Sequence, residues 1–193
     1  MAMVESSPLA PATLAPGERQ VFPTAPLIRL TLLLLYLALM GPLPFLAQAT
    51  QAASPWLLLA GIGLGGLGIY GALGQRVEVD DQGIQVSYPR WIRWLLRGGW
   101  QLPWSEAKAL KPRSTGQGGL VYYFVGTQQR AYLLPMRVAG FARLVELVET
   151  YTGIDTQDVK PLAQPWMYFV LLGFTLLLLL VDAWTVATAL QMA

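Results

Sequence analysis

The segment Pro165–Leu190 constrains this chain most strongly, because no charged residue precedes Asp182 within it. An α-helix rises about 1.5 Å per residue, so about 20 apolar residues cross a hydrocarbon core about 30 Å thick. The segment exceeds that length, and Trp166, Tyr168 and Trp184 stand toward its ends, as is typical of side chains at the headgroup level. We therefore predict a transmembrane helix over 165–190, with a buried helix of a soluble protein as the alternative.

Composition agrees with a membrane protein and excludes much chemistry. Of the 193 residues, 54% are hydrophobic and only 12% are charged, whereas about a quarter of the residues in soluble domains are charged. The chain has no cysteine and no histidine, so it lacks disulfides, thiolate metal sites, cysteine nucleophiles and the commonest general base. We expect no enzyme activity, no metal and no cofactor.

Two further apolar segments predict a transmembrane hairpin over 27–74. The first span is Leu27–Ala47, and its prolines Pro42 and Pro44 should kink or end the helix near Met40. The second is Trp56–Gly74, which is long enough to cross a membrane. Together with 165–190, these segments predict a membrane protein with three transmembrane helices.

Small residues recur along one face of the second span. Gly61, Gly65, Gly68 and Ala72 follow a helical spacing, which lets another helix approach the backbone closely. The partner on this face can be the first span, the third span or another protein.

The N-terminal residues 1–26 hold five of the fourteen prolines and few charges. Such a segment cannot bury enough surface to offset its ordering entropy. We predict a flexible arm, either a linker without a further role or a docking arm for a partner.

Basic residues flank the spans on one side. Arg29, Arg76 and Lys160 lie at or near span ends, while the loop 48–55 and the C-terminus carry no Lys or Arg. The positive-inside rule then places the N-terminus and the middle domain in the cytoplasm and the C-terminus on the opposite side. We expect an integral, multi-pass protein of an inner membrane or, as the resemblance given below implies, of the thylakoid.

Asp182 is the only acidic residue within any span. Acids inside membranes are usually functional, but this one lies toward the far interface. It is therefore either hydrated there or in contact with a partner or pigment.

The middle region 75–160 changes from helical to strand periodicity. Valines alternate with polar residues over 76–79, a turn follows at 80–83, and a second alternating run covers 84–88, which predicts a hairpin. Further strands are expected near 100–103 and 107–112, and 120–125 should pair with 130–135. A helix over 137–152 should close the domain, with Gly153 at its C-terminal cap and a stripe of apolar side chains. The stripe comprises Phe141, Leu144, Val145, Val148 and Tyr151.

This order predicts an α+β domain of antiparallel strands plus one C-terminal helix, placed between the second and third spans. Four segments carry a resemblance: V-E-V-D-D-Q-G-I-Q-V-S-Y-P-R-W at 77–91, L-P-W-S-E-A-K-A-L at 102–110, Y-Y-F-V-G-T-Q-Q-R-A-Y-L-L-P at 122–135 and A-R-L-V-E-L-V-E-T-Y at 142–151. After two spans, they resemble the bacterial membrane-anchored PH-like proteins. In layout they are similar to the small photosystem assembly factors of thylakoids in cyanobacteria and chloroplasts, from which this chain departs by its third span.

The resemblance implies a PH-like half-barrel plugged by its helix, a role in photosystem assembly, and photosystem subunits as partners. It brings no catalytic residue to any position of this chain.

A basic, tryptophan-rich stretch at Tyr88–Trp104 is the strongest candidate for contact with a partner or lipid. Its arginines are spaced to share one face of a helix while its large apolar side chains take the other, as in an interfacial helix. The alternative is a long loop whose tryptophans fill the domain's own core. The proposed contact residues are Arg90, Trp91, Arg93, Trp94, Arg97, Lys108, Lys111 and Arg113.

Three functions compete at this stage. The first is a non-enzymatic assembly or accessory factor that docks on a large membrane complex, which the resemblance suggests is a photosystem. The second is a sensor of anionic lipid headgroups or of the membrane surface. A transporter or channel subunit is disfavoured because the spans lack a polar stripe, and we expect no nucleic-acid partner.

Overall fold

The computed structural model describes residues 14–50, 54–96, 99–116, 119–127, 130–159 and 165–192. The chain divides into two compact units. Described residues of Met1–Phe22, Val77–Val86 and Trp100–Leu162 form what we call the sheet unit, and those of Pro23–Arg76, Ser87–Gly99 and Ala163–Ala193 form the span unit.

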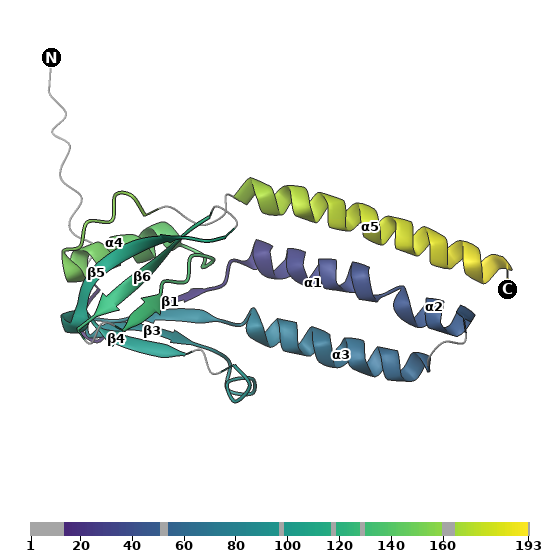
Figure 1. Cartoon of the computed structure of the whole chain (residues 1–193), viewed down its shortest axis with the longest axis horizontal. Coiled ribbons are helices and arrows are strands. Elements are labelled where there is room, and N and C mark those ends of the chain that lie inside the picture. Colours follow the sequence, from purple (N-terminus) through teal and green to yellow (C-terminus); the bar gives the residue numbers. More distant parts are fainter. Residues whose placement is uncertain are drawn as a thin grey trace, which may run out of the picture. The chain divides into compact units, whose positions relative to one another are not determined.

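The elements follow one another as shown in Figure 1. In chain order they are β1 (Gln20–Pro23), α1 (Pro26–Met40), α2 (Leu43–Thr50), α3 (Pro55–Ala72), β2 (Arg76–Val79), β3 (Gly83–Ser87), β4 (Trp100–Pro103), the 3-10 turn η1 (Trp104–Glu106), β5 (Ala107–Ser114), β6 (Leu120–Gly126), β7 (Ala131–Leu133), α4 (Phe141–Thr152) and α5 (Pro165–Met192).

The first sheet has the strand order β1-β2-β3-β4. The predicted turn at 80–83 is confirmed: the Asp80 side chain accepts hydrogen bonds from the backbone N–H groups of Gln82 at 3.1 Å and Gly83 at 2.9 Å. Strands β3 and β4 are antiparallel, with Ile84 opposite Leu102. Alternation then directs Ile84 and Val86 into the core.

The second sheet has the strand order β5-β6-β7 and is antiparallel throughout. Leu110 lies opposite Phe124, and Tyr123 lies opposite Leu133. The predicted pairing of 120–125 with 130–135 is confirmed. The strand predicted over 107–112 extends to Ser114.

Helix α4 begins at Phe141, four residues later than predicted. Gly140 has φ of 75°, a left-handed conformation that ends the preceding turn and cannot continue a right-handed helix. The predicted cap at Gly153 is confirmed, since its N–H donates to the Glu149 carbonyl at 2.8 Å. Leu147 is fully buried, although the predicted stripe omits it.

The core of the sheet unit combines side chains from both sheets, from α4 and from the segment that precedes α1. Its buried members are Phe22, Val77, Val79, Ile84, Val86, Leu102, Trp104, Tyr122, Phe124, Leu134, Met136, Val138, Phe141, Leu144, Leu147 and Val148. Antiparallel sheets combined with a helix agree with the α+β prediction.

The flexible arm predicted for 1–26 is wrong for its described part, 14–26. Residues 20–23 form β1 beside β2, and Phe22 is only 3% exposed. The Arg19 guanidinium contacts the carboxylates of Glu78 at 2.9 Å and Asp80 at 3.5 Å. Burial of Phe22 and pairing with a strand some fifty residues away offset the ordering cost that composition alone suggests. Residues 1–13 lie outside the described part of the chain.

The span unit contains three helical segments long and apolar enough to cross a membrane. They cover Pro26–Gln48, Pro55–Ala72 and Trp166–Thr188. Helix α1 packs against both α3 and α5 (Figure 1). Along the first segment α1 ends at Met40 and α2 begins at Leu43, so the predicted break at the prolines is confirmed.

Candidate functional site

The segment Tyr88–Leu96, which we call the basic segment, forms successive turns instead of the predicted helix. The N–H groups of Ile92 and Arg93 both donate to the Pro89 carbonyl at 3.1 Å, and those of Leu95 and Leu96 donate to the Ile92 carbonyl at 2.9 and 3.0 Å. A helix between Pro89 and the glycines at 98–99 would be too short to be stable by itself. Arg97 lies outside the described residues.

The basic segment is held against the end of α3. Ile92 is only 3% exposed, and a Cβ placed on Gly71 would lie 2.5 Å from Ile92 Cδ1 and 2.5 Å from Trp91 Cη2. Pro89 approaches Gly74 just as closely, since a Cβ on Gly74 would lie 2.6 Å from Pro89 Cγ. Glycine at these positions is therefore required for the close approach.

Tyr88 anchors the beginning of the basic segment. Its hydroxyl forms a hydrogen bond with the Gln75 side chain. Partial burial raises the pKa of Tyr88, and the hydrogen bond with Gln75 opposes that rise. The phenol thus stays neutral and available as a hydrogen-bonding group at physiological pH.

The outer side of the basic segment combines cationic and apolar side chains. Trp94 is 78% exposed, Trp91 is 45% exposed and Leu95 is 60% exposed. Arg90 and Arg93 are exposed beside them. The segment packs on Gly71, one residue before the end of the candidate span at Ala72, so these side chains lie close to the end of that span. Tryptophan is enriched at membrane interfaces.

The other predicted contact residues lie in the sheet unit. Lys108, Lys111 and Arg113 are exposed along β5. Lys111 and Arg113 share one face of the strand by alternation, whereas Lys108 stands at a register shift between Ala107 and Ala109. The positive charge of 88–113 is therefore divided between two units of the chain.

Only some tryptophans of this stretch serve the core of the sheet unit. Trp104 is a core residue, and Trp100 is partly buried and packs against the core. The Trp100 ring centroid lies 5.3 Å from that of Tyr132 and 6.3 Å from that of Phe124. The core-filling alternative thus applies to Trp100 and Trp104, whereas Trp91 and Trp94 are exposed and do not belong to the core of the sheet unit.

The glycine face of α3 is used in part by the first span. A Cβ on Gly65 would lie 2.5 Å from the Tyr36 hydroxyl, which donates to the Ile62 carbonyl at 2.8 Å. A Cβ on Gly61 or Gly68 would have no neighbour within 4 Å among the described residues. Gly65 therefore serves packing of α3 on α1.

We expect Gly65→Leu to separate α1 from α3, because the new side chain would occupy the position of the Tyr36 hydroxyl and break its hydrogen bond with Ile62. The midpoint of thermal unfolding of the full chain in detergent micelles should fall. Gly61→Leu is the matched control and should leave the midpoint unchanged. Equal midpoints for both variants and the parent would contradict the assignment.

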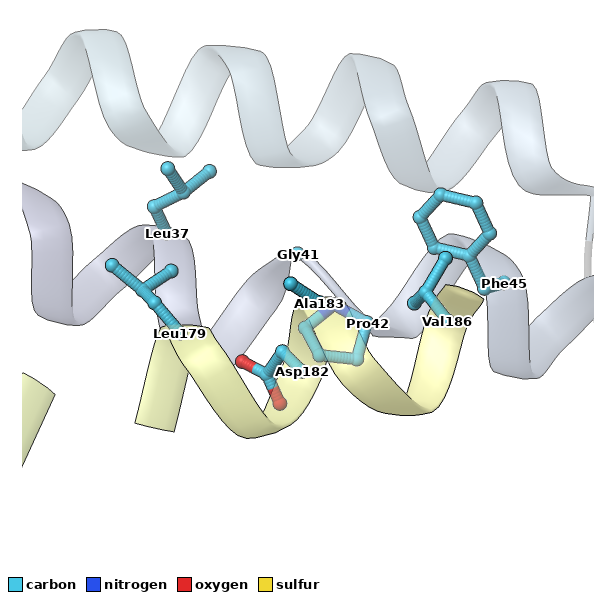
Figure 2. Close-up of a pocket in the computed structure, with 8 residues that line it drawn as sticks. All are labelled: Leu37, Gly41, Pro42, Phe45, Leu179, Asp182, Ala183 and Val186. Carbon is cyan, nitrogen blue, oxygen red and sulfur yellow. The ribbon is translucent and has the colours of Figure 1, made fainter. Parts of the chain in front are cut away.

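A second candidate site surrounds Asp182, where α5 passes the break between α1 and α2 (Figure 2). A cavity of about 260 Å³ is lined there by Leu37, Gly41, Pro42, Phe45, Leu179, Asp182, Ala183 and Val186. Asp182 Oδ2 is buried and has no hydrogen-bond partner in the described structure. The sequence indicates both the prolines and the acid, but only the packing of α1 on α5 brings them together.

No group of three potential metal-ligating side chains occurs among the described residues. Two acids of the sheet unit have structural roles: Asp80 orders the turn at 80–83, and Glu78 contacts Arg19. The prediction that the chain is not an enzyme stays a prediction.

Comparison with known proteins identifies a relative in a cyanobacterium. The chain is 56% identical over 176 residues to the protein named "Uncharacterized protein slr0269" of Synechocystis sp. (strain ATCC 27184 / PCC 6803 / Kazusa). The aligned region covers 90% of this chain and 88% of the relative. The chain belongs to the family of this cyanobacterial protein. No family model matches the chain, and no solved structure matches it. The three candidate spans and the cyanobacterial relative fit a membrane location.

Proposed function

We propose that this protein is a non-enzymatic accessory or assembly factor of the thylakoid or inner membrane. In this proposal it docks on a large membrane complex, a photosystem, through its spans and its basic, tryptophan-bearing surfaces. One observation carries the proposal: Ile92 and Trp91 fix the basic segment to the end of α3 while Arg90, Arg93 and Trp94 remain exposed.

Side chains with this composition suit recognition better than folding. Tryptophan and arginine are enriched where protein interfaces gain most of their binding energy. Attachment to a transmembrane helix limits their movement, so little entropy is lost when a partner in the same membrane binds them. The element order of two sheets and a final helix supports a PH-like domain, and the cyanobacterial relative supports a thylakoid location.

The placement of the basic segment also favours a second function, the sensing of anionic lipid. Trp94 and Leu95 are exposed close to the end of a candidate span, where they can enter the headgroup region while Arg90 and Arg93 contact phosphates. In that case the segment should bind the bilayer surface without any protein partner.

We expect the double variant Arg90→Gln/Arg93→Gln to weaken docking by about tenfold or more, since each basic group near an anionic surface contributes about 1 kcal/mol. The measurement is the amount of photosystem subunits that co-purify with the tagged full chain from gently solubilised cyanobacterial membranes. The matched control is Arg130→Gln/Arg137→Gln, which removes the same charge from exposed sites of the sheet unit.

The same variants decide between the two functions. The full chain is placed in lipid nanodiscs with brominated acyl chains, and quenching of tryptophan fluorescence is compared between anionic and zwitterionic lipid. If the double variant retains fewer photosystem subunits than the parent but shows the same tryptophan quenching, docking on a complex is supported. If quenching in anionic lipid falls in the double variant, and the parent retains no photosystem subunits, lipid sensing is supported. Equal retention of subunits by parent and double variant would overturn docking through this segment.

A further inference from the structure

The Asp182 carboxyl group faces an environment that does not satisfy it. One of its oxygens is buried without a hydrogen-bond partner in the described structure, and the other residues that line its cavity are apolar, glycine or proline (Figure 2). An unpaired acid in apolar surroundings within a membrane is costly, so such groups are found with partners.

The break between α1 and α2 borders the cavity through Gly41 and Pro42, and neither residue has a free backbone N–H to offer Asp182. Pro42 and Pro44 have no N–H, so the carbonyls of Ala38 and Met40 cannot receive the usual helical hydrogen bond from the residue four positions later. The Gly41 N–H already donates to the Leu37 carbonyl at 2.7 Å. The carboxyl-terminal end of a helix is also the negative end of its dipole, so a cation or hydrogen-bond donor is the complementary ligand.

The chain itself cannot supply a cation at this depth. The sequence has no Lys or Arg at 30–75 or at 161–193, and these ranges include both Asp182 and the residues of the helix break. A second copy in the same orientation would bring the same acid and the same lack of basic residues. A cationic partner for Asp182 must therefore come from a different molecule.

Depth favours a protein over a lipid or a metal ion. Asp182 precedes Thr188, the last residue of its candidate span, by six residues, which is about 9 Å of helix. A lipid headgroup would have to leave the interface to reach it, whereas a side chain on a spanning helix need not. One carboxyl group among mainly apolar walls is also a poor ligand set for a metal ion.

We propose that this cavity receives the Lys or Arg side chain of a partner's transmembrane helix, which pairs with Asp182. The aliphatic stem of such a side chain suits the apolar walls, and its head suits the carboxylate. Val181 and Trp184, exposed on the same helix, offer further surface to that partner. The inference rests on the proposed docking function and names one contact that it uses.

The first test compares Asp182→Asn, Asp182→Leu and Asp182→Glu in the full chain. Each tagged variant is extracted from native membranes in mild detergent, and the co-purifying membrane proteins are quantified. We expect about tenfold less complex with Asn and Leu, because one partner of a desolvated charge pair is lost, and substantial recovery with Glu. Thr185→Val, a change at a neighbouring exposed residue of α5, is the control and should retain the complex.

A second measurement separates failure of this contact from failure of the docking function. A bilayer-soluble carbodiimide modifies accessible carboxyl groups in apolar surroundings, and mass spectrometry reports the modification of Asp182. We expect labelling in native membranes to be several-fold slower than in the purified, partner-free chain. If the complex is retained by Asn and Leu variants and Asp182 labels equally in both settings, the pairing is wrong while docking stands. If the parent retains no complex and Asp182 labels equally in both settings, the pairing and the docking function are both wrong. A cross-linker placed at position 183 gives a further check, since a cross-link to a second copy of this chain would also overturn the pairing.

Discussion

Trp104→Ala should lower the free energy of unfolding of the sheet unit by about 3–5 kcal/mol, the usual cost of truncating a buried aromatic side chain. Trp104 is 8% exposed. Its ring stacks on that of Tyr151 with centroids 5.5 Å apart, and its Nε1–H donates to the Asp80 carbonyl at 2.9 Å. The substitution therefore leaves a cavity and removes the donor to the turn at 80–83.

The measurement is chemical unfolding of the full chain in detergent micelles, followed by near-ultraviolet circular dichroism and by limited proteolysis within β2 to α4. The matched control is Trp94→Ala, since Trp94 is 78% exposed. It should leave the unfolding midpoint unchanged. A similar loss of stability in both variants would mean that the basic segment belongs to the folded core and is not a contact surface.

Elements determined by local sequence could be predicted closely. The alternation around Val77 and Val86, with an aspartate and a glycine between them, specifies a hairpin because turn chemistry and strand periodicity agree. The helix break at the prolines is equally local, since Pro42 and Pro44 remove backbone donors wherever the segment lies. The cap at Gly153 follows from the same kind of rule.

Features that depend on distant residues could not be predicted. The spacing of Arg90 and Arg93 suggests a helix, but packing of Ile92 against Gly71 holds turns instead. The glycine pattern of α3 does not reveal that Tyr36 reaches Gly65. Likewise, Asp182 and the helix break are each visible in the sequence, whereas their common cavity depends on how α5 packs on α1.

The N-terminal segment shows how composition can mislead. Its prolines and scattered apolar residues suggest that it cannot fold, yet Phe22 completes a core formed by residues beyond the first two spans. A strand that joins a sheet across three intervening helices has no local signal apart from the pair Val21 and Phe22. The energy that orders it comes from the sheet to which it adds.

Phe22→Ala should therefore destabilise the sheet unit by about 3–5 kcal/mol, as expected for a buried phenylalanine. Phe22 is 3% exposed, whereas Val21 on the same strand is 47% exposed and provides the control Val21→Ala. Chemical unfolding of the full chain in micelles, followed as for Trp104→Ala, should have a lower midpoint for Phe22→Ala and an unchanged midpoint for Val21→Ala. Because β1 precedes α1, a fragment of 75–160 lacks this strand and should be less stable than the same unit in the full chain. If the fragment is as stable as the unit in the full chain, and Phe22→Ala leaves the unfolding midpoint unchanged, the N-terminal strand contributes nothing to the stability of the fold.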